Sequence, residues 1–189
     1  AAQMCIRDSS DQERFFRQNY NAFRKKLNAP FLKGDRQYPL GTIATRSTML
    51  DIYEKIITKD PVAALDELTE NAAIYAGIIL NKTDTLSDEQ CESYLDLQRV
   101  QGAPSYLFIM YLIKHQESLG VTDEDVVKIC KLLVNFFIRR NLTDTPPTRD
   151  LTRIFMSFIE ATEQNEYRGA DIYTNMRDTL ISVSASDEF

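Results

Sequence analysis

Four arginines lie in one polar, proline-rich stretch of the chain, between two apolar segments. They are Arg139, Arg140, Arg149 and Arg153. A guanidinium group carries a planar fork of N–H donors, which matches two oxygens of a carboxylate or of a phosphate. These residues can therefore either pair with acids of the same chain or bind the phosphates of DNA.

The residues around these arginines favour the first of the two interpretations. Between the apolar segments lie Asp144, Pro146, Pro147, Thr148 and Asp150. The two carboxylates are close enough in sequence to pair with arginines, the prolines stiffen the elbow, and we expect Thr148 to cap the next helix. We expect an ion-paired corner that locks two core helices, in which Arg140→Ala costs about 3 kcal/mol. The alternative, a clamp of arginines on DNA phosphates, stays open.

Residue types that support catalysis are scarce in the sequence. His115 is its single histidine, and one histidine without a cysteine pair cannot build the common zinc sites. The sequence contains neither a GxxxxGK[ST] phosphate loop nor a GxGxxG motif. Cys91 and Cys130 lie in apolar helical patterns, which are typical of buried, unreactive thiols. We therefore expect no catalytic residue, no metal site and no cofactor in this chain.

The spacing of apolar residues predicts helices along the whole chain. Phe16, Tyr20, Phe23 and Leu27, for example, recur at the spacing of one helix face. The predicted helices cover residues 11–27, 48–59, 61–80, 88–100, 104–120, 123 to the arginine elbow, the elbow to Gly169, and 170–183. We expect an all-α fold, an irregular bundle of seven or eight helices without a substantial sheet.

Helix starts and stops are marked by capping residues. Asp60 followed by Pro61 predicts a helix start, because aspartate caps and proline fits the first helical position. Ser87 and Gln90 have the spacing of a capping box, and Thr122 precedes three acids. Gly120 is placed to end the helix before it.

Composition and the two ends of the chain indicate its organisation. The formal net charge of −6 argues against a surface wholly coated with nucleic acid. Residues 1–9 contain MCIRDS, which resembles a translated sequencing adapter, and we exclude them from the fold. We assign residues 10–47 to an N-terminal helix with a long irregular connector and 48–189 to a helical bundle. The last four residues read as a helix start, so we expect truncation at the C-terminus.

The three cysteines and the apolar content indicate where such a protein works. Free thiols suit a reducing compartment, and no apolar run approaches the length of a membrane span. We therefore expect a cytoplasmic protein that does not contact a membrane.

The arginine stretch also carries a resemblance to a known family. Residues 136–155 read FFIRRNLTDTPPTRDLTRIF. Together with the helical run from about Tyr53, they resemble the helical middle region of GmrSD-type modification-dependent restriction endonucleases. The matching feature is a bulky apolar helix that ends in Arg139 and Arg140, then a Thr/Pro elbow, then a Leu–Ile–Phe helix.

The resemblance implies a function for the chain as part of a longer protein. In that family a ParB-like N-terminal domain with an Asp-Gly-Gln-Gln-Arg motif handles nucleotide, and a C-terminal HNH domain cuts DNA. Neither motif occurs here. The resemblance implies a non-catalytic scaffold of an NTP-dependent, phage-defence DNA endonuclease. Its partners are then the two missing domains of the same chain and DNA.

Two other functions compete with this hypothesis. The first is a stand-alone helical adaptor that binds a protein, suggested by the apolar positions Phe15, Phe16 and Tyr20 on an unpaired first helix. The second is a small enzyme with a site made of acids alone, which no constellation of residues supports. An adaptor predicts a self-contained reading frame and a stable complex with its partner.

Overall fold

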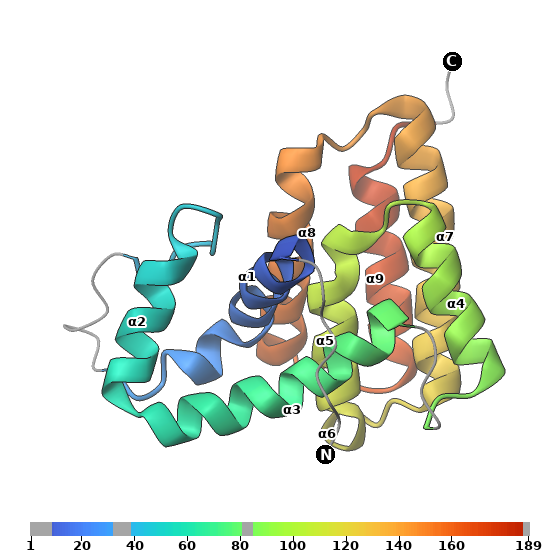
Figure 1. Ribbon diagram of the computed structural model, residues 1–189. Helices are drawn as coiled ribbons and strands as arrows, with labels where there is room; N and C mark the ends of the chain where they lie inside the picture. The colour runs from blue at the N-terminus through green and yellow to red at the C-terminus, as the bar shows by residue number, and fades with distance from the viewer. Residues whose placement is uncertain (1–8, 32–38, 81–84, 187–189) are drawn as a thin grey trace. The chain divides into compact units, whose positions relative to one another are not determined.

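The computed structural model describes residues 9–31, 39–80 and 85–186, and over these residues it is all-α, with no strand. The expected helical fold class is therefore confirmed. Of the adapter-like residues 1–9, all but Ser9 lie outside the described part, as do the middle of the connector, residues 81–84 and the last three residues. Figure 1 shows the elements in chain order: α1 (Ser9–Leu27), α2 (Met49–Lys59), α3 (Pro61–Leu80), α4 (Asp88–Arg99), η1 (Ala103–Ser105), α5 (Tyr106–Lys114), α6 (Gln116–Leu119), α7 (Asp123–Thr143), α8 (Thr148–Gln164) and α9 (Ala170–Val183).

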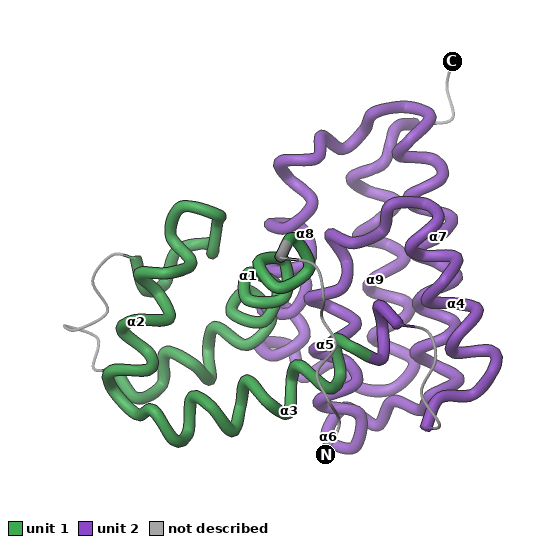
Figure 2. Tube along the Cα trace, in the orientation of Figure 1, with its two compact units in different colours: residues 1–76 green, residues 77–189 purple. Residues whose placement is uncertain are grey.

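The chain divides into two compact units, residues 1–76 and residues 77–189 (Figure 2). Unit 1 contains α1, α2 and most of α3, and unit 2 contains the last residues of α3 and all later helices. The domain boundary that we expected after residue 47 falls inside unit 1, because α1 packs against α2.

Unit 1 is built on aromatic contacts of α1. The Phe15 ring packs against Tyr75 of α3, with 5.4 Å between centroids, and Phe16 packs edge-on against Tyr53 of α2 at 5.0 Å. Phe15 and Tyr20 are buried. The first helix is therefore not unpaired, and the basis of the adaptor hypothesis is wrong: the residues that suggested it face the interior of their own unit.

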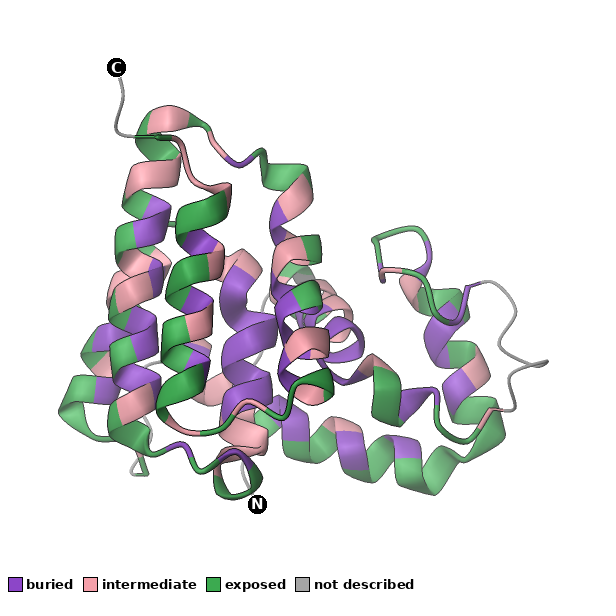
Figure 3. Cartoon of the chain, turned by 180° about the vertical axis from the view of Figure 1, so that it is seen from behind, coloured by how far each residue is buried: buried purple, intermediate pink, exposed green. Residues whose placement is uncertain are grey.

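Unit 2 contains a closed ring of four helices. Helix α5 contacts α7 and α8, and α9 contacts the same two helices, while α4 packs on the outside of α7. All residues from Tyr106 to Leu112 of α5 are buried, and Figure 3 shows this helix as the most enclosed of the unit. Helix α7 contacts α4, α5 and α9, and Ile138 and Leu142 on it are exposed.

The caps predicted at the starts of α3, α4 and α7 are present. Ser87 and Gln90 form a capping box at the start of α4, and Thr122 forms one with Asp125 at the start of α7. The Asp60 carboxylate accepts a hydrogen bond from the Ala63 amide, 3.0 Å away, at the start of α3. Gly120 has a φ of +62°, the left-handed conformation that ends a helix at little cost for glycine.

One predicted helix is divided in the structure. Residues 104–120 form η1, α5 and α6 in place of a single helix, with a break at His115, whose φ is −112°. The His115 ring packs against Tyr111, with 4.8 Å between ring centroids. Neither glycine nor proline marks this break, so the sequence pattern predicts one continuous helix across it.

Among the described residues, no helix combines the length and the apolar character that a membrane span requires.

Candidate functional site at the arginine elbow

The elbow is the short connection between α7 and α8 in unit 2. Helix α7 ends at Thr143, and Asp144 follows with a φ of +53°. Aspartate tolerates this left-handed conformation better than most residues, so it turns the chain away from the helix axis. The Thr145–Pro146 peptide bond is cis. Helix α8 then begins at Thr148.

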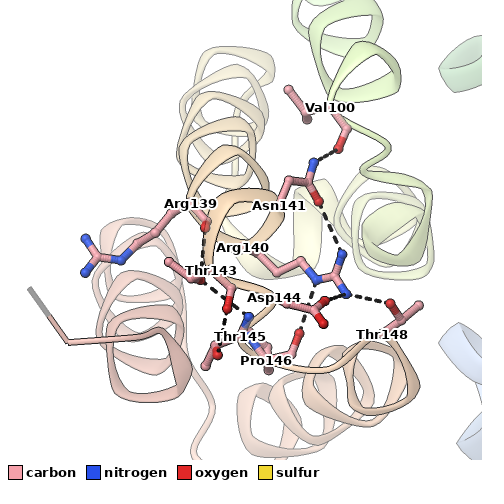
Figure 4. Close-up of polar contacts among 9 residues, drawn as sticks. All are labelled: Val100, Arg139, Arg140, Asn141, Thr143, Asp144, Thr145, Pro146 and Thr148. Carbon is pink, nitrogen blue, oxygen red and sulfur yellow. Dashed lines mark hydrogen bonds and ion pairs between the residues drawn. The ribbon is translucent and has the colours of Figure 1, made fainter. Parts of the chain in front are cut away.

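Arg140 ties the two sides of the elbow together (Figure 4). Its Nη2 donates to the Asp144 carboxylate at 3.0 Å and to the Thr148 hydroxyl at 2.6 Å. Its Nε donates to the carbonyl oxygen of Pro146 at 3.1 Å. The Arg140 side chain is 15% exposed, whereas that of Asp144 is 89% exposed. One guanidinium therefore holds the end of α7, the connection and the first residue of α8.

The predicted cap of α8 is wrong. Pro147 precedes the helix, and no side chain caps its first turn. Thr148 is itself the first helical residue, and its hydroxyl accepts a hydrogen bond from Arg140. Thr148 lies one residue after the cap position, and from there its hydroxyl reaches the Arg140 guanidinium. Its role is therefore to bind Arg140.

Arg139 points to the opposite side of α7. Figure 4 shows its guanidinium directed away from that of Arg140. Its Nη2 donates to the carbonyl oxygen of Ala185, just after α9, at 2.6 Å. Its backbone carbonyl accepts from the Thr143 hydroxyl at 3.0 Å. Arg139 is half-buried and holds the segment that follows α9 against α7.

Arg149 and Arg153 are placed differently from the first two arginines. Their side chains are 86% and 69% exposed, and Asp150 lies near both, at 4.0 and 3.7 Å. These distances are too long for hydrogen bonds, and such surface pairs contribute little to stability. Four residues apart, the two arginines share one face at the N-terminal end of α8. Of the four candidate arginines, these two present their donors to solvent.

Asn141 is a part of this site that the sequence analysis missed. Its Nδ2 donates to the carbonyl oxygen of Val100, just after α4, at 3.0 Å. Its Oδ1 lies 3.3 Å from Nη1 of Arg140. The elbow is thereby joined to the end of α4 as well. An asparagine in the last turn of a predicted helix was the available signal, since its amide bonds well to free carbonyl groups.

A second polar cluster, also missed from the sequence, lies inside unit 1. The Asn19 amide donates to the Tyr53 hydroxyl at 2.8 Å, and the Asn71 amide donates to Asn19 Oδ1 at 2.7 Å and to Glu67 Oε1 at 3.0 Å. The other Glu67 oxygen accepts from Lys26. Asn19 and Asn71 are wholly buried, and burial raises the pKa of Tyr53 above its ordinary value. Asn19, a polar residue beside the apolar stripe of the first helix, was the missed signal.

Metal ligands do not gather in the described residues. No three His, Cys, Asp or Glu side chains there are placed to hold a metal ion. Burial raises the pKa of the Cys130 thiol to about 12, so it stays protonated and a poor nucleophile near neutral pH. At the elbow, Arg139 and Arg140 hold neighbouring segments of the chain together. The exposed guanidinium groups of Arg149 and Arg153 are suited to bind an anion.

No protein-family model, curated protein or solved structure matches this chain.

Proposed function

We propose that this chain is a non-catalytic helical scaffold of a GmrSD-type, DNA-cleaving restriction endonuclease, and that it contacts DNA. In that role it spaces a nucleotide-handling domain and a nuclease domain of the same protein. The observation that carries the proposal is the different use of the four elbow arginines. Arg139 and Arg140 are bonded within unit 2, whereas Arg149 and Arg153 face solvent.

A scaffold must keep the directions of its connections fixed, and the first arginine pair supports this. Arg140 bonds to Asp144, Pro146 and Thr148, so α7 and α8 meet at a corner held by several donors. Arg139 bonds the segment after α9 to the same stretch of α7. Charge-assisted hydrogen bonds of this kind are stronger than neutral ones. Together the two arginines join α7 to the start of α8 and to the segment after α9.

Contact with DNA is assigned to the second pair. Arg149 and Arg153 lie on one face of α8, near the positive end of the helix dipole. Guanidinium groups on such a face suit successive phosphates of a duplex backbone. Contacts of this kind carry no sequence information, which fits a scaffold that positions other domains.

The family origin is tested by reading the DNA on both sides of the coding frame. The proposal predicts an upstream sequence for Asp-Gly-Gln-Gln-Arg and a downstream HNH motif in the same frame. A start codon near Ser10 together with a stop codon after Phe189 contradicts it.

The DNA contact is tested by fluorescence anisotropy with a labelled duplex over a series of salt concentrations. We expect Arg149→Ala/Arg153→Ala to weaken binding and to make the slope of log K against log salt shallower by about 2, one unit for each lost phosphate contact. The control is Arg99→Ala/Arg177→Ala, which removes two surface arginines that pair with Asp96 and Asp178. An equal loss of duplex affinity in the two double variants contradicts a specific DNA contact by Arg149 and Arg153 of α8.

A further inference from the structure

A cavity of about 380 Å³ lies within unit 1, bounded by the end of α1, the end of α2 and the first turns of α3. This volume is in the range of small-molecule sites. None of the elbow residues lines it. Part of its wall is apolar, formed by Leu27, Phe31, Ile56 and Ala64. An apolar wall of this kind suits the body of an organic ligand, and the charged residues at the cavity decide which kind.

The charges that line the cavity are mostly negative. Four carboxylates border it, from Asp60, Asp66, Glu67 and Glu70, against the ammonium groups of Lys26 and Lys59. Glu67 is the buried member of this group, with a side chain 9% exposed. A carboxylate removed from water in this way needs a cation and hydrogen-bond donors close by. Positive charge on a ligand therefore favours its binding in this cavity.

Glu67 is held on one side by the protein interior and on the other by a surface side chain. Its Oε1 accepts from the buried Asn71 amide at 3.0 Å, which fixes the carboxylate in place. Its Oε2 accepts from Lys26, whose side chain is 59% exposed. A lysine side chain is long and flexible, and the solvent can take up its ammonium group when it leaves. The cation on the outer side of Glu67 is thus exchangeable, whereas the Asn71 amide on its inner side is fixed.

The aromatic ring in the cavity wall also has a cation near it. The Lys59 ammonium lies 6.0 Å from the centroid of the Phe31 ring. Cations are attracted to the face of an aromatic ring at about this distance. The cavity therefore offers a buried carboxylate and a ring face, and both attract positive charge.

We propose that this cavity binds a small organic cation with a flat apolar body, of the amidinium or guanidinium class. The two N–H groups of such a ligand match the Glu67 carboxylate, where they take the place of the Lys26 ammonium. Its body lies against Leu27 and Phe31. This site is separate from the elbow arginines and does not depend on the function proposed for them.

Benzamidine is a suitable probe, because it combines a planar ring with an amidinium group. Titrated into the 189-residue chain, it is expected to shift the backbone amide NMR signals of Ala63 and Ala64. Benzamide, which has nearly the same shape without the charge, is expected to bind at least about ten-fold more weakly than benzamidine, since it lacks the charge-assisted hydrogen bonds. Equal binding of the two compounds overturns the proposal.

Four variants locate the site. Glu67→Gln is expected to weaken benzamidine binding about ten-fold or more, and Lys26→Met to strengthen it, because the competing ammonium group is gone. Glu54→Gln changes an exposed acid of α2 outside this cavity; it is the matched control and is expected to keep the wild-type affinity.

Ala63→Leu places a larger side chain at an exposed helical position in the cavity wall. It is expected to abolish binding, and it tests the site even if Glu67→Gln does not fold. Unchanged binding by Ala63→Leu overturns the proposal.

Discussion

The elbow of unit 2 and the buried cluster of unit 1 both join helices with polar side chains, but over different distances along the chain. Arg140 bonds to residues four, six and eight positions away. In the buried cluster, Asn19 bonds to Tyr53 and Asn71, which are 34 and 52 positions away. The elbow is partly open to water, whereas both asparagines are wholly buried.

This difference decides how much each region contributes to stability. A polar group at the surface that loses its partner is rehydrated, so the loss is small. A buried group that loses its partner stays without a hydrogen bond, and its full desolvation cost remains. We therefore expect the buried amides of unit 1 to matter more for stability than the arginines of the elbow.

The largest effect is expected for Asn71→Ala. It removes the donor to Asn19 Oδ1 and Glu67 Oε1, and both acceptors remain inside unit 1. We expect a loss of about 3 kcal/mol in the free energy of unfolding, measured by chemical denaturation. The control is Asn175→Ala in α9, whose amide bonds at the surface to the Asp171 carbonyl. Similar losses in the two variants contradict the role of burial.

The next largest effect is expected for Arg140→Ala. Four hydrogen bonds are lost, but Asp144 is 89% exposed and is rehydrated. We therefore expect a loss of about 2 kcal/mol, less than the typical cost when the remaining partner is buried. Denaturation of the purified variant measures it. A change below about 0.5 kcal/mol shows that the corner is not held by this side chain.

A smaller, pH-dependent effect is expected at the capping box of α7. The bond from the Thr122 backbone amide, followed by the bond from its side chain, holds the pKa of Asp125 below its ordinary value of 3.8. The contribution of this carboxylate is therefore present above pH 3.8 and is lost as the pH falls through the lowered pKa of the folded state. We expect Asp125→Ala to cost about 0.5 kcal/mol near neutral pH.

The measurement for this prediction is the difference in unfolding free energy between wild type and Asp125→Ala over a range of pH. The difference should shrink towards acid. Glu124→Ala is the control, because that side chain is 74% exposed and pairs with Lys128 at the surface. A difference that grows towards acid gives the pKa shift the opposite sign and contradicts the assignment.

The smallest effect is expected for Arg149→Ala/Arg153→Ala. Their contacts with Asp150 are 4.0 and 3.7 Å long and lie at the surface. We expect the free energy of unfolding to stay within about 0.5 kcal/mol of wild type. A thermal or chemical denaturation curve is sufficient. A larger loss shows that these arginines support the fold, and their assignment to DNA then loses its basis.

The same difference in distance explains which parts of the structure could be predicted from the sequence. The capping boxes at Ser87 and Thr122 and the pair of Arg140 with Asp144 involve residues three or four positions apart. Local geometry sets such contacts, so the sequence pattern predicts them. Helical periodicity likewise predicted the all-α fold, because apolar spacing reflects burial on one helix face.

Other contacts depend on how the chain packs, and the sequence does not predict them. Arg139 bonds to the Ala185 carbonyl, 46 positions away, and nothing in the pattern indicates that partner. The buried asparagines of unit 1 are of the same kind, since each needs a partner from another helix. The break at His115 follows from packing too, because no helix-breaking residue marks it. Which arginines face solvent became evident only from the packing of the elbow.

The most direct test of the account is a double-mutant cycle between Arg140 and Thr148. Arg140→Met keeps the apolar stem and removes the charge, and Thr148→Val removes the hydroxyl that lies 2.6 Å from Nη2. We predict a coupling energy of about 1 kcal/mol, because the two side chains bond directly across the elbow. Coupling energies close to zero contradict an elbow in which Arg140 joins α7 to α8.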